Sequence, residues 1–224
     1  MASLAVAAPP QWGGEITLAS DHLLRGVSRS TNDPSLSAEM HAQGSQGWFA
    51  GAWAATSRVS ETYDTSVDLA ATLGMGGTWG ENWNWRGSYS HYQSPWQRNA
   101  SWYRYNEFTL DMAFGDALLF SASWSPDTAA YSAYLGTVRR GDAFAYELSL
   151  QHTLIGKLRG QTGIGYYDLS SQLGEGYWYG SIGVGWTWQR WHTSVSYVHT
   201  SDAAQRFWPE TARRGAVASV SYGF

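Results

Sequence analysis

The stretch "RGAVASVSYGF", residues 214–224, carries the clearest indication of the fold. Every second residue back from Phe224 as far as Ala216 is apolar or aromatic, and the residues between them are small and mostly polar. Because the side chains of a strand point alternately to opposite faces, this pattern predicts a strand with one apolar and one polar face. An apolar face that ends on an aromatic residue is typical of the closing strand of an outer-membrane barrel, although the edge strand of a soluble sandwich alternates equally well.

The same alternation continues along the chain from Glu15. It gives twelve segments of about ten residues, and no helical period persists. The predicted strands cover residues 15–28, 35–43, 48–56, 63–75, 83–92, 105–114, 117–124, 143–154, 158–169, 177–188, 191–200 and 214–224. A further strand at residues 129–138 would make the number odd, whereas a barrel with both ends in the periplasm needs an even number. We therefore assign residues 129–138 to a long hairpin extension or an outer loop.

The connections between these segments differ in length in a regular way. Short turns are predicted at residues 44–47, 76–82, 115–116, 156–157 and 189–190, and longer loops at 29–34, 57–62, 93–102, 126–141, 169–176 and 201–213. The prolines after residue 10 lie in or beside the longer loops, because proline cannot donate a backbone hydrogen bond to a sheet. Short periplasmic turns that alternate with longer outer loops predict an all-β fold, a twelve-stranded antiparallel transmembrane β-barrel.

The composition agrees with a single barrel domain over residues 14–224. The chain has 14 Trp and 14 Tyr, and both residues concentrate where apolar surface meets water. A mean hydropathy of -0.36 excludes a helical membrane protein. The absence of Cys excludes thiolate metal sites, and a net charge of -4 without a basic block argues against nucleic acid as a partner.

Residues 1–13 are expected to lie outside the barrel domain. The opening "MASLAVAAPP" contains a run of small residues of the kind found at signal-peptide cleavage sites, but it has neither a positive n-region nor a full apolar h-region. It is either the remainder of an export signal or a disordered N-terminal extension.

The stretch "LASDHLLRGVSRSTNDPSLSAEM", residues 18–40, resembles the opening of the TorF-type porins, the Gcw_chp family of proteobacterial outer-membrane proteins. The matching residues are Ser20, Asp21, Leu24, Arg25, Gly26, Val27, Ser28, Asn32, Asp33 and Pro34. His22 stands where an aromatic residue is usual in the family. The likeness covers the rest of the chain loosely, through strand number and the final aromatic residue. It implies an outer-membrane location and supplies no substrate and no catalytic residue.

Charged residues on the predicted inward faces form the candidate lumen site. They are Asp21, Arg25, Glu39, Asp64, Asp68, Arg86, Glu107, Asp111, Glu147 and Arg159. Asp21 and Arg25 would be ~13 Å apart along one strand, so each is expected to pair with a neighbouring strand, for example Arg25 with Glu39. The acidic excess predicts cation preference in a water-filled lumen. The alternative is a mutually satisfied ion network that fills a closed barrel, since twelve strands lie between the packed and open sizes.

The sequence therefore predicts a porin-like passive channel for small solutes or ions, weakly cation-preferring, in the outer membrane of a Gram-negative bacterium. Alternatives are a closed barrel whose outer loops bind ligands or adhere, and an outer-membrane lipid-acting enzyme. Such an enzyme needs a Ser–His pair, and Ser90–His91 and His199–Ser201 supply the residue types without a recognisable motif.

No cofactor or metal is expected, because the six histidines show no metal-ligand spacing. The expected partners are outer-membrane lipids, small solutes or ions, and the barrel-assembly machinery, which would act through the C-terminal strand and Phe224. The sequence leaves the oligomeric state open.

Overall fold

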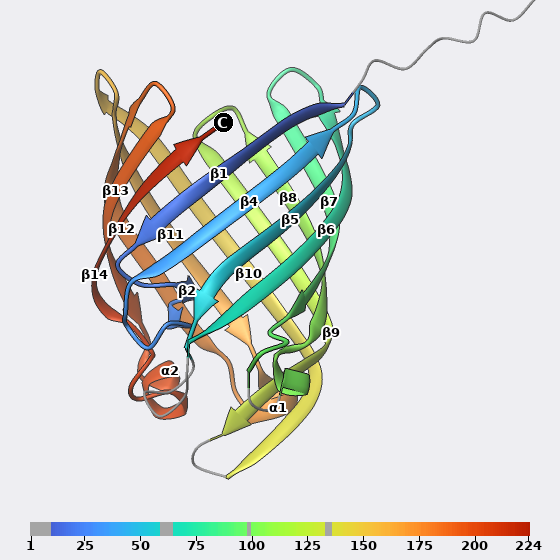
Figure 1. The fold of residues 1–224 in the computed structure, drawn as a ribbon, viewed down its shortest axis with the longest axis vertical. Coiled ribbons are helices and arrows are strands. Elements are labelled where there is room, and N and C mark those ends of the chain that lie inside the picture. The colour runs from blue at the N-terminus through green and yellow to red at the C-terminus, as the bar shows by residue number, and fades with distance from the viewer. Residues whose placement is uncertain (1–9, 59–64, 98–99, 133–135) are drawn as a thin grey trace, which may run out of the picture.

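A computed structural model describes residues 10–58, 65–97, 100–132 and 136–224 of the chain (Figure 1). Twelve strands close into one antiparallel barrel in the order β1-β14-β13-β12-β11-β10-β9-β8-β7-β6-β5-β4, which confirms the predicted fold. The barrel strands are β1 (Gln11–Ala19), β4 (Ser35–Gln43), β5 (Trp48–Ser57), β6 (Ser66–Trp79), β7 (Trp83–Gln93), β8 (Tyr105–Phe114), β9 (Leu118–Ser132), β10 (Thr137–Ile155), β11 (Leu158–Asp168), β12 (Tyr177–Trp188), β13 (Trp191–Thr200) and β14 (Arg214–Gly223).

The remaining elements lie in the longer loops. A two-stranded hairpin, β2 (Leu23–Leu24) and β3 (Val27–Ser28), lies between β1 and β4. The helices are η1 (Ala100–Tyr103), α1 (Ser170–Leu173) and α2 (Asp202–Phe207). No helix in the described part of the chain is long and apolar enough to cross a membrane.

The barrel closes between its first and last strands. Ile16 pairs with Tyr222 and Leu18 with Val220 along the β1–β14 seam. Beyond the end of β14, the amide of Phe224 donates to the carbonyl of Gly14 at 3.0 Å, and the amide of Gly14 donates to the carbonyl of Phe224 at 3.2 Å. The ring of Phe224 covers Gly14 so closely that a Cβ there would lie 2.7 Å from the ring. Phe224 therefore extends the closing ladder and fills the space that the glycine leaves.

Alternate side chains of the barrel wall face two different surroundings. On the lumen-facing side of the wall, hydroxyl groups pair across neighbouring strands: Thr17 with Ser221, Thr72 with Ser90, Thr109 with Ser123, and Ser194 with Ser219, at 2.8–2.9 Å. On the outer face, large apolar side chains such as Leu73, Leu148 and Ile182 are 61%, 41% and 66% exposed. An apolar exterior around a hydroxyl-lined interior is the pattern of a transmembrane barrel.

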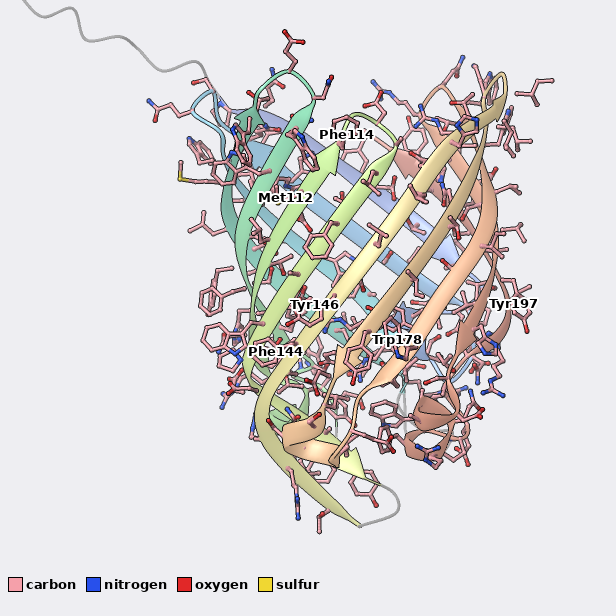
Figure 2. The ribbon with its side chains drawn as sticks, turned by 180° about the vertical axis from the view of Figure 1, so that it is seen from behind. Met112, Phe114, Phe144, Tyr146, Trp178 and Tyr197 are labelled. Carbon is pink, nitrogen blue, oxygen red and sulfur yellow. The ribbon has the colours of Figure 1, made fainter. Side chains whose placement is uncertain are left out.

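Aromatic side chains form two belts around the exterior. Trp83, Phe114, Trp186, Trp188 and Trp191 lie beside the short turns, and Tyr89, Phe108, Trp124, Phe144, Tyr146, Trp178 and Tyr197 lie nearer the longer loops. Figure 2 shows Met112 and Phe114 toward the short-turn end and Phe144, Tyr146 and Trp178 toward the other. Aromatic girdles of this kind mark the two edges of the apolar band that faces lipid. We call the ends of the barrel the inner end, which carries the short turns, and the outer end.

Several predicted boundaries are wrong by a few residues. β1 begins at Gln11, so residues 11–13 belong to the barrel rather than to the N-terminal extension. β6 continues to Trp79, which shortens the predicted turn at 76–82. Residues 129–132 belong to β9 and residues 137–138 to β10, so the first of the two predicted alternatives, a hairpin extension, is confirmed, with residues 133–135 outside the described part. A register shift between Gly141 and Ala143 bends this hairpin beyond the outer belt.

The closing contacts of Phe224 generate a first prediction. Phe224→Asp removes the ring that covers Gly14 and should reduce the yield of folded barrel in the membrane. Phe224→Tyr keeps the ring and is the matched control. The measurement is heat-modifiable electrophoretic migration of the membrane fraction, and equal folded yields for the two variants would contradict the role given to the ring.

Two neighbouring residues of β10 test the assignment of the two faces. Leu148 and Ser149 are both exposed, but they point to opposite sides of the wall. Leu148→Arg should lower the free energy of unfolding by about 2–4 kcal/mol because a guanidinium would face the middle of the apolar band. Ser149→Arg should have a much smaller effect in a water-filled lumen. Chemical denaturation in lipid vesicles measures both, and equal losses would mean that the faces are misassigned.

Candidate functional site: a loop inside the lumen

Residues 20–34, which we call the plug loop, leave the wall and fold into the barrel (Figure 1). The prediction that the first strand continues to Ser28 is therefore wrong. Arg25 and Gly26 have φ angles of 50° and 78°, and they join the paired residues Leu24 and Val27. Two successive left-handed residues form the tight turn that suits a two-residue hairpin. Gly26 is required there, because a Cβ would also lie 2.6 Å from Thr200.

The turn places Arg25 across the lumen from β1. Its Nη2 lies 2.7 Å from Oε2 of Glu107 on β8, with β4, β5, β6 and β7 between that strand and β1. Both side chains are 8% exposed. The guanidinium lies 4.4 Å from the ring centroid of Tyr167, and the hydroxyl of Tyr177 donates to the Arg25 carbonyl at 3.1 Å. Ser125 donates to the same Glu107 oxygen at 3.1 Å. The ion pair therefore joins the tip of the plug loop to the opposite wall.

Arg29 forms a second link, to the wall strand β6. Its Nε and Nη2 donate to Oδ2 of Asp68 at 3.1 and 3.0 Å. The other carboxylate oxygen accepts hydrogen bonds from Ser57, at 2.8 Å, and from Ser94. The guanidinium also lies 4.9 Å from the ring centroid of Tyr103. Asp68 is thus supplied with donors on both oxygens, as a buried carboxylate requires.

Asp21 organises the plug loop from within. Its side chain is fully buried, and its Oδ1 accepts hydrogen bonds from Ser28 at 2.5 Å and from Ser30 at 2.9 Å. Nε of Arg213 lies 3.7 Å from the other oxygen. Capture of the returning segment by the Asp21 carboxylate explains why the chain turns here instead of continuing along the wall.

The segment after α2 covers the plug loop from the outer side. The amide of Arg213 donates to the Gly26 carbonyl at 2.9 Å, and the amide of Ser28 donates to the Thr211 carbonyl at 2.8 Å. The side-chain amide of Asn32 donates to the Glu210 carbonyl at 2.9 Å. These contacts join loops that are far apart in sequence at one end of the barrel.

The outer half of the lumen is packed as a result. Ala143, Ala145, Tyr167, Leu169, Tyr177, Ala204 and Ala212 form one buried apolar cluster, against which Val27 of the plug loop packs. Gln172, beside this cluster, is 1% exposed and donates to the carbonyls of Thr128 and Gly141 at 3.1 and 2.8 Å. Every residue of the family-like motif noted in the sequence lies between Ser20 and Pro34, within this plug.

The inner half of the lumen contains a cavity of about 1070 Å³. Glu39, His41, Thr72 and Arg86 supply polar groups to its lining, and Phe49 lies beneath the guanidinium of Arg86, whose carbon is 4.3 Å from the ring centroid. The cavity reaches Trp53 on β5, on which the ring of His22 packs edge-on with 5.3 Å between centroids. Burial lowers the pKa of His22 despite the nearby Asp68 carboxylate, so a neutral imidazole contacts the indole at neutral pH.

The structure separates the predicted lumen residues into three groups. Asp21, Arg25, Asp68 and Glu107 meet at the plug loop, and the expected pairing of Arg25 with Glu39 is wrong. Oε1 of Glu39 instead lies 3.6 Å from Nδ1 of His41. Arg86 lines the inner cavity, and Asp111, opposite it on β8, accepts a hydrogen bond from Ser121 at 2.7 Å. Glu147 accepts from Tyr179, and Arg159 donates to Gln151 at 3.2 Å. Asp64 lies outside the described residues.

Sequence reasoning missed Arg29, Trp53 and Arg213. The two arginines lie in predicted loops, where no alternation assigns a side chain to the lumen or to the lipid. Trp53 belongs to "WFAGAWAAT", residues 48–56, in which both faces are apolar, so its alternation does not reveal the side that faces the lumen. A large aromatic residue among alanines and a glycine was the available signal.

The Ser–His pairs considered for a lipid-acting enzyme are not assembled as such. Ser90 faces the lumen and pairs with Thr72, whereas His91, the next residue of the strand, is directed to the other face with Nδ1 2.8 Å from Oδ1 of Asn106. The hydroxyl of Ser201 accepts from the amide of Trp178 at 3.2 Å.

The solved structures most informative for comparison are outer-membrane porins and a related transporter. The KdgM porin is 8% identical with a TM-score of 0.58, over 95% of this chain and 99% of that chain. The NanC porin is 7% identical with a TM-score of 0.60, over 94% and 98%. The toluene transporter TodX of P. putida is 9% identical with a TM-score of 0.51, over 96% and 89%. At these identities the similarity shows a porin-type fold. No family model and no curated protein matches the sequence.

The Arg25–Glu107 pair generates a prediction about the plug loop. Arg25→Met leaves the Glu107 carboxylate buried without its cation and should lower the free energy of opening of the loop by about 3–5 kcal/mol. Hydrogen exchange of the amides of residues 20–34 measures this. Arg159→Met removes an exposed guanidinium and is the control. Arg25→Met combined with Glu107→Gln should recover part of the loss. Equal exchange in all variants would mean that this ion pair does not hold the plug loop to the wall.

Proposed function

We propose that the protein is a porin-like channel in the outer membrane of a Gram-negative bacterium, through which small solutes or ions pass passively. The observation that carries this proposal is the combination of a lipid-facing aromatic exterior with a charged cavity of about 1070 Å³ inside the barrel. A barrel that served only as an anchor would not need a polar cavity of that size. The porin-type fold of the similar structures supports the same function.

The plug loop gives the channel its size limit. A barrel of about eight strands has an interior that its own wall side chains fill, and twelve strands enclose more space than that. The segment that occupies the lumen therefore sets the width of the path for solutes. Here the outer half is occupied by the plug loop, held by Arg25 and Arg29. Conduction through the native barrel is therefore expected to be small and to depend on displacement of this loop.

Weak cation preference follows from the charges that the plug loop leaves unpaired. Among the described wall residues of the inner lumen, Glu15, Glu39, Asp111 and Glu147 are acidic, and Arg86 and Arg159 are basic. Glu15 lies opposite Glu39 in the β1–β4 register, so two carboxylates face one part of the wall. A low-dielectric wall with excess negative charge raises the local concentration of cations.

The dense packing of the plug loop favours a second function. If the loop never moves, the protein is a closed barrel whose outer loops bind a ligand or adhere. Conductance distinguishes the two functions, because a correctly folded channel conducts ions and a correctly folded closed barrel does not.

Planar-bilayer recordings test the channel. Small unitary currents are expected for the native protein, and larger ones for Arg25→Met combined with Arg29→Met, which loosens both links of the plug loop. Arg159→Met leaves both links of the plug loop intact and should not show the larger currents. Absence of current from the native barrel and from the loosened variant would support the closed barrel instead.

Zero-current potentials in a salt gradient test selectivity. Potassium should permeate better than chloride, and the preference should fade as the screening length falls from ~10 Å at 0.1 M salt to ~3 Å at 1 M. Glu15→Gln with Glu39→Gln should weaken the preference, whereas Arg86→Gln should strengthen it. Anion preference of the native barrel would exclude the proposed role of these carboxylates.

A further inference from the structure

A second cavity, of about 280 Å³, lies at the outer end of the barrel. One side is formed by His22, Leu24 and Val27 of the plug loop, and the other by Ala130 and Tyr131 of the β9 extension. Trp53 lines both this cavity and the inner one. The outer cavity exists because the plug loop and the β9–β10 hairpin do not close against each other.

The lining of the outer cavity is predominantly aromatic. Nine tyrosine and tryptophan residues border it, including Trp53, Tyr92, Trp102, Tyr105, Tyr131 and Trp208. The rings of Tyr92 and Tyr105 stack at 4.7 Å, and those of Trp102 and Tyr131 lie parallel at 6.1 Å with 7° between planes. Such ring faces contact flat apolar molecules through stacking and edge-to-face packing.

The charged groups that border the outer cavity are already paired. Arg29 and Asp68 bind each other, and Ser57 and Ser94 complete the shell of the carboxylate. An ionic ligand would find no partner charge here and would lose its hydration. The lining therefore selects for an uncharged molecule.

The mouth of the outer cavity is apolar and open to the exterior. Leu24, Trp102 and Tyr131 are 37%, 37% and 45% exposed. Leu24 is on the plug loop, whereas Trp102 and Tyr131 lie beyond the outer aromatic belt, on η1 and on the β9 extension. Because this position is outside the lipid-facing band, the exposed apolar surface is not explained by contact with lipid. Exposed apolar surface in water commonly marks a binding site.

From these features we infer that the outer cavity binds a small uncharged aromatic molecule of one or two rings. A dry cavity of about 150 Å³ accepts one benzene ring, so a cavity of the size seen here accommodates one or two. The inference goes beyond the proposed channel, because binding at this site does not require that the ligand or any ion pass through the barrel. It also identifies Trp53 and His22 as the partition between the outer site and the inner lumen.

Binding of 4-fluorophenol to the purified barrel, followed by fluorine NMR, tests the inference. The probe is uncharged at pH 7, and excess unlabelled phenol separates saturable binding from partitioning into detergent, which does not saturate. Ala130→Trp fills the cavity from its buried wall and should weaken saturable binding at least tenfold. Ala122→Trp adds the same side chain to the outward, lipid-facing side of the same strand and should leave binding unchanged. The anion 4-fluorobenzoate should show no saturable binding.

The possible outcomes distinguish binding in the outer cavity from binding on the lipid-facing wall and from conduction through the barrel. Binding that persists in Ala130→Trp but is lost in Ala122→Trp would place the probe in the groove that Phe108, Ala122 and Trp124 line on the lipid-facing wall, and would overturn the inference. Purely non-saturable uptake by the native barrel would also overturn it. If Ala130→Trp does not fold, Trp102→Ala decides, since removal of a rim ring must weaken binding. Conductance is measured separately, so a silent barrel that binds 4-fluorophenol would refute the channel and keep the site.

Discussion

The ion pair between Arg25 and Glu107 is the interaction on which the interior of this barrel depends. Two charges that are each 8% exposed are stable in the lumen only if they neutralise each other, and here they come from opposite sides of the barrel. Their pairing fixes the tip of the plug loop against β8 and brings the Arg25 carbonyl to Tyr177. The packed outer half and the open inner half of the lumen both follow from this placement.

The plug loop also divides the space in the lumen by chemistry. On the inner side, charged and hydroxyl side chains line a cavity of about 1070 Å³. On the outer side, tyrosine and tryptophan rings line a smaller cavity whose charged groups are internally paired. Trp53, with His22 packed on its edge, stands between them. A barrel of this width therefore presents different surfaces to solutes that arrive from its two ends.

Charge in the lumen is set jointly by the wall and by the loops. The wall strands carry an excess of carboxylates, and the plug loop brings Arg25 and Arg29 to two of them, Glu107 and Asp68. Arg213, in the segment after α2, faces Asp21 of the plug loop itself. These arginines neutralise the acidic residues of the outer half and leave those of the inner half unpaired. The selective part of the path is consequently expected near the inner end, between Glu39 and Arg86.

The barrel could be predicted from local patterns in the sequence. Period-two alternation, aromatic residues at strand ends and the sorting of short and long connections are local consequences of a wall that faces lipid on one side and water on the other, so they can be counted along the chain. The strand number and the outward position of Leu148 were predictable in this way, whereas for residues 129–138 the same patterns allow either a hairpin extension or an outer loop. The interior was not predictable, because nothing local in the sequence shows that Asp21 will capture Ser28 and Ser30. The pairing of Arg25 with Glu107 rather than Glu39 could not be predicted, because contacts across a lumen depend on how the barrel closes and on where the plug loop folds. Neither leaves a pattern in the local sequence around Arg25 or Glu107.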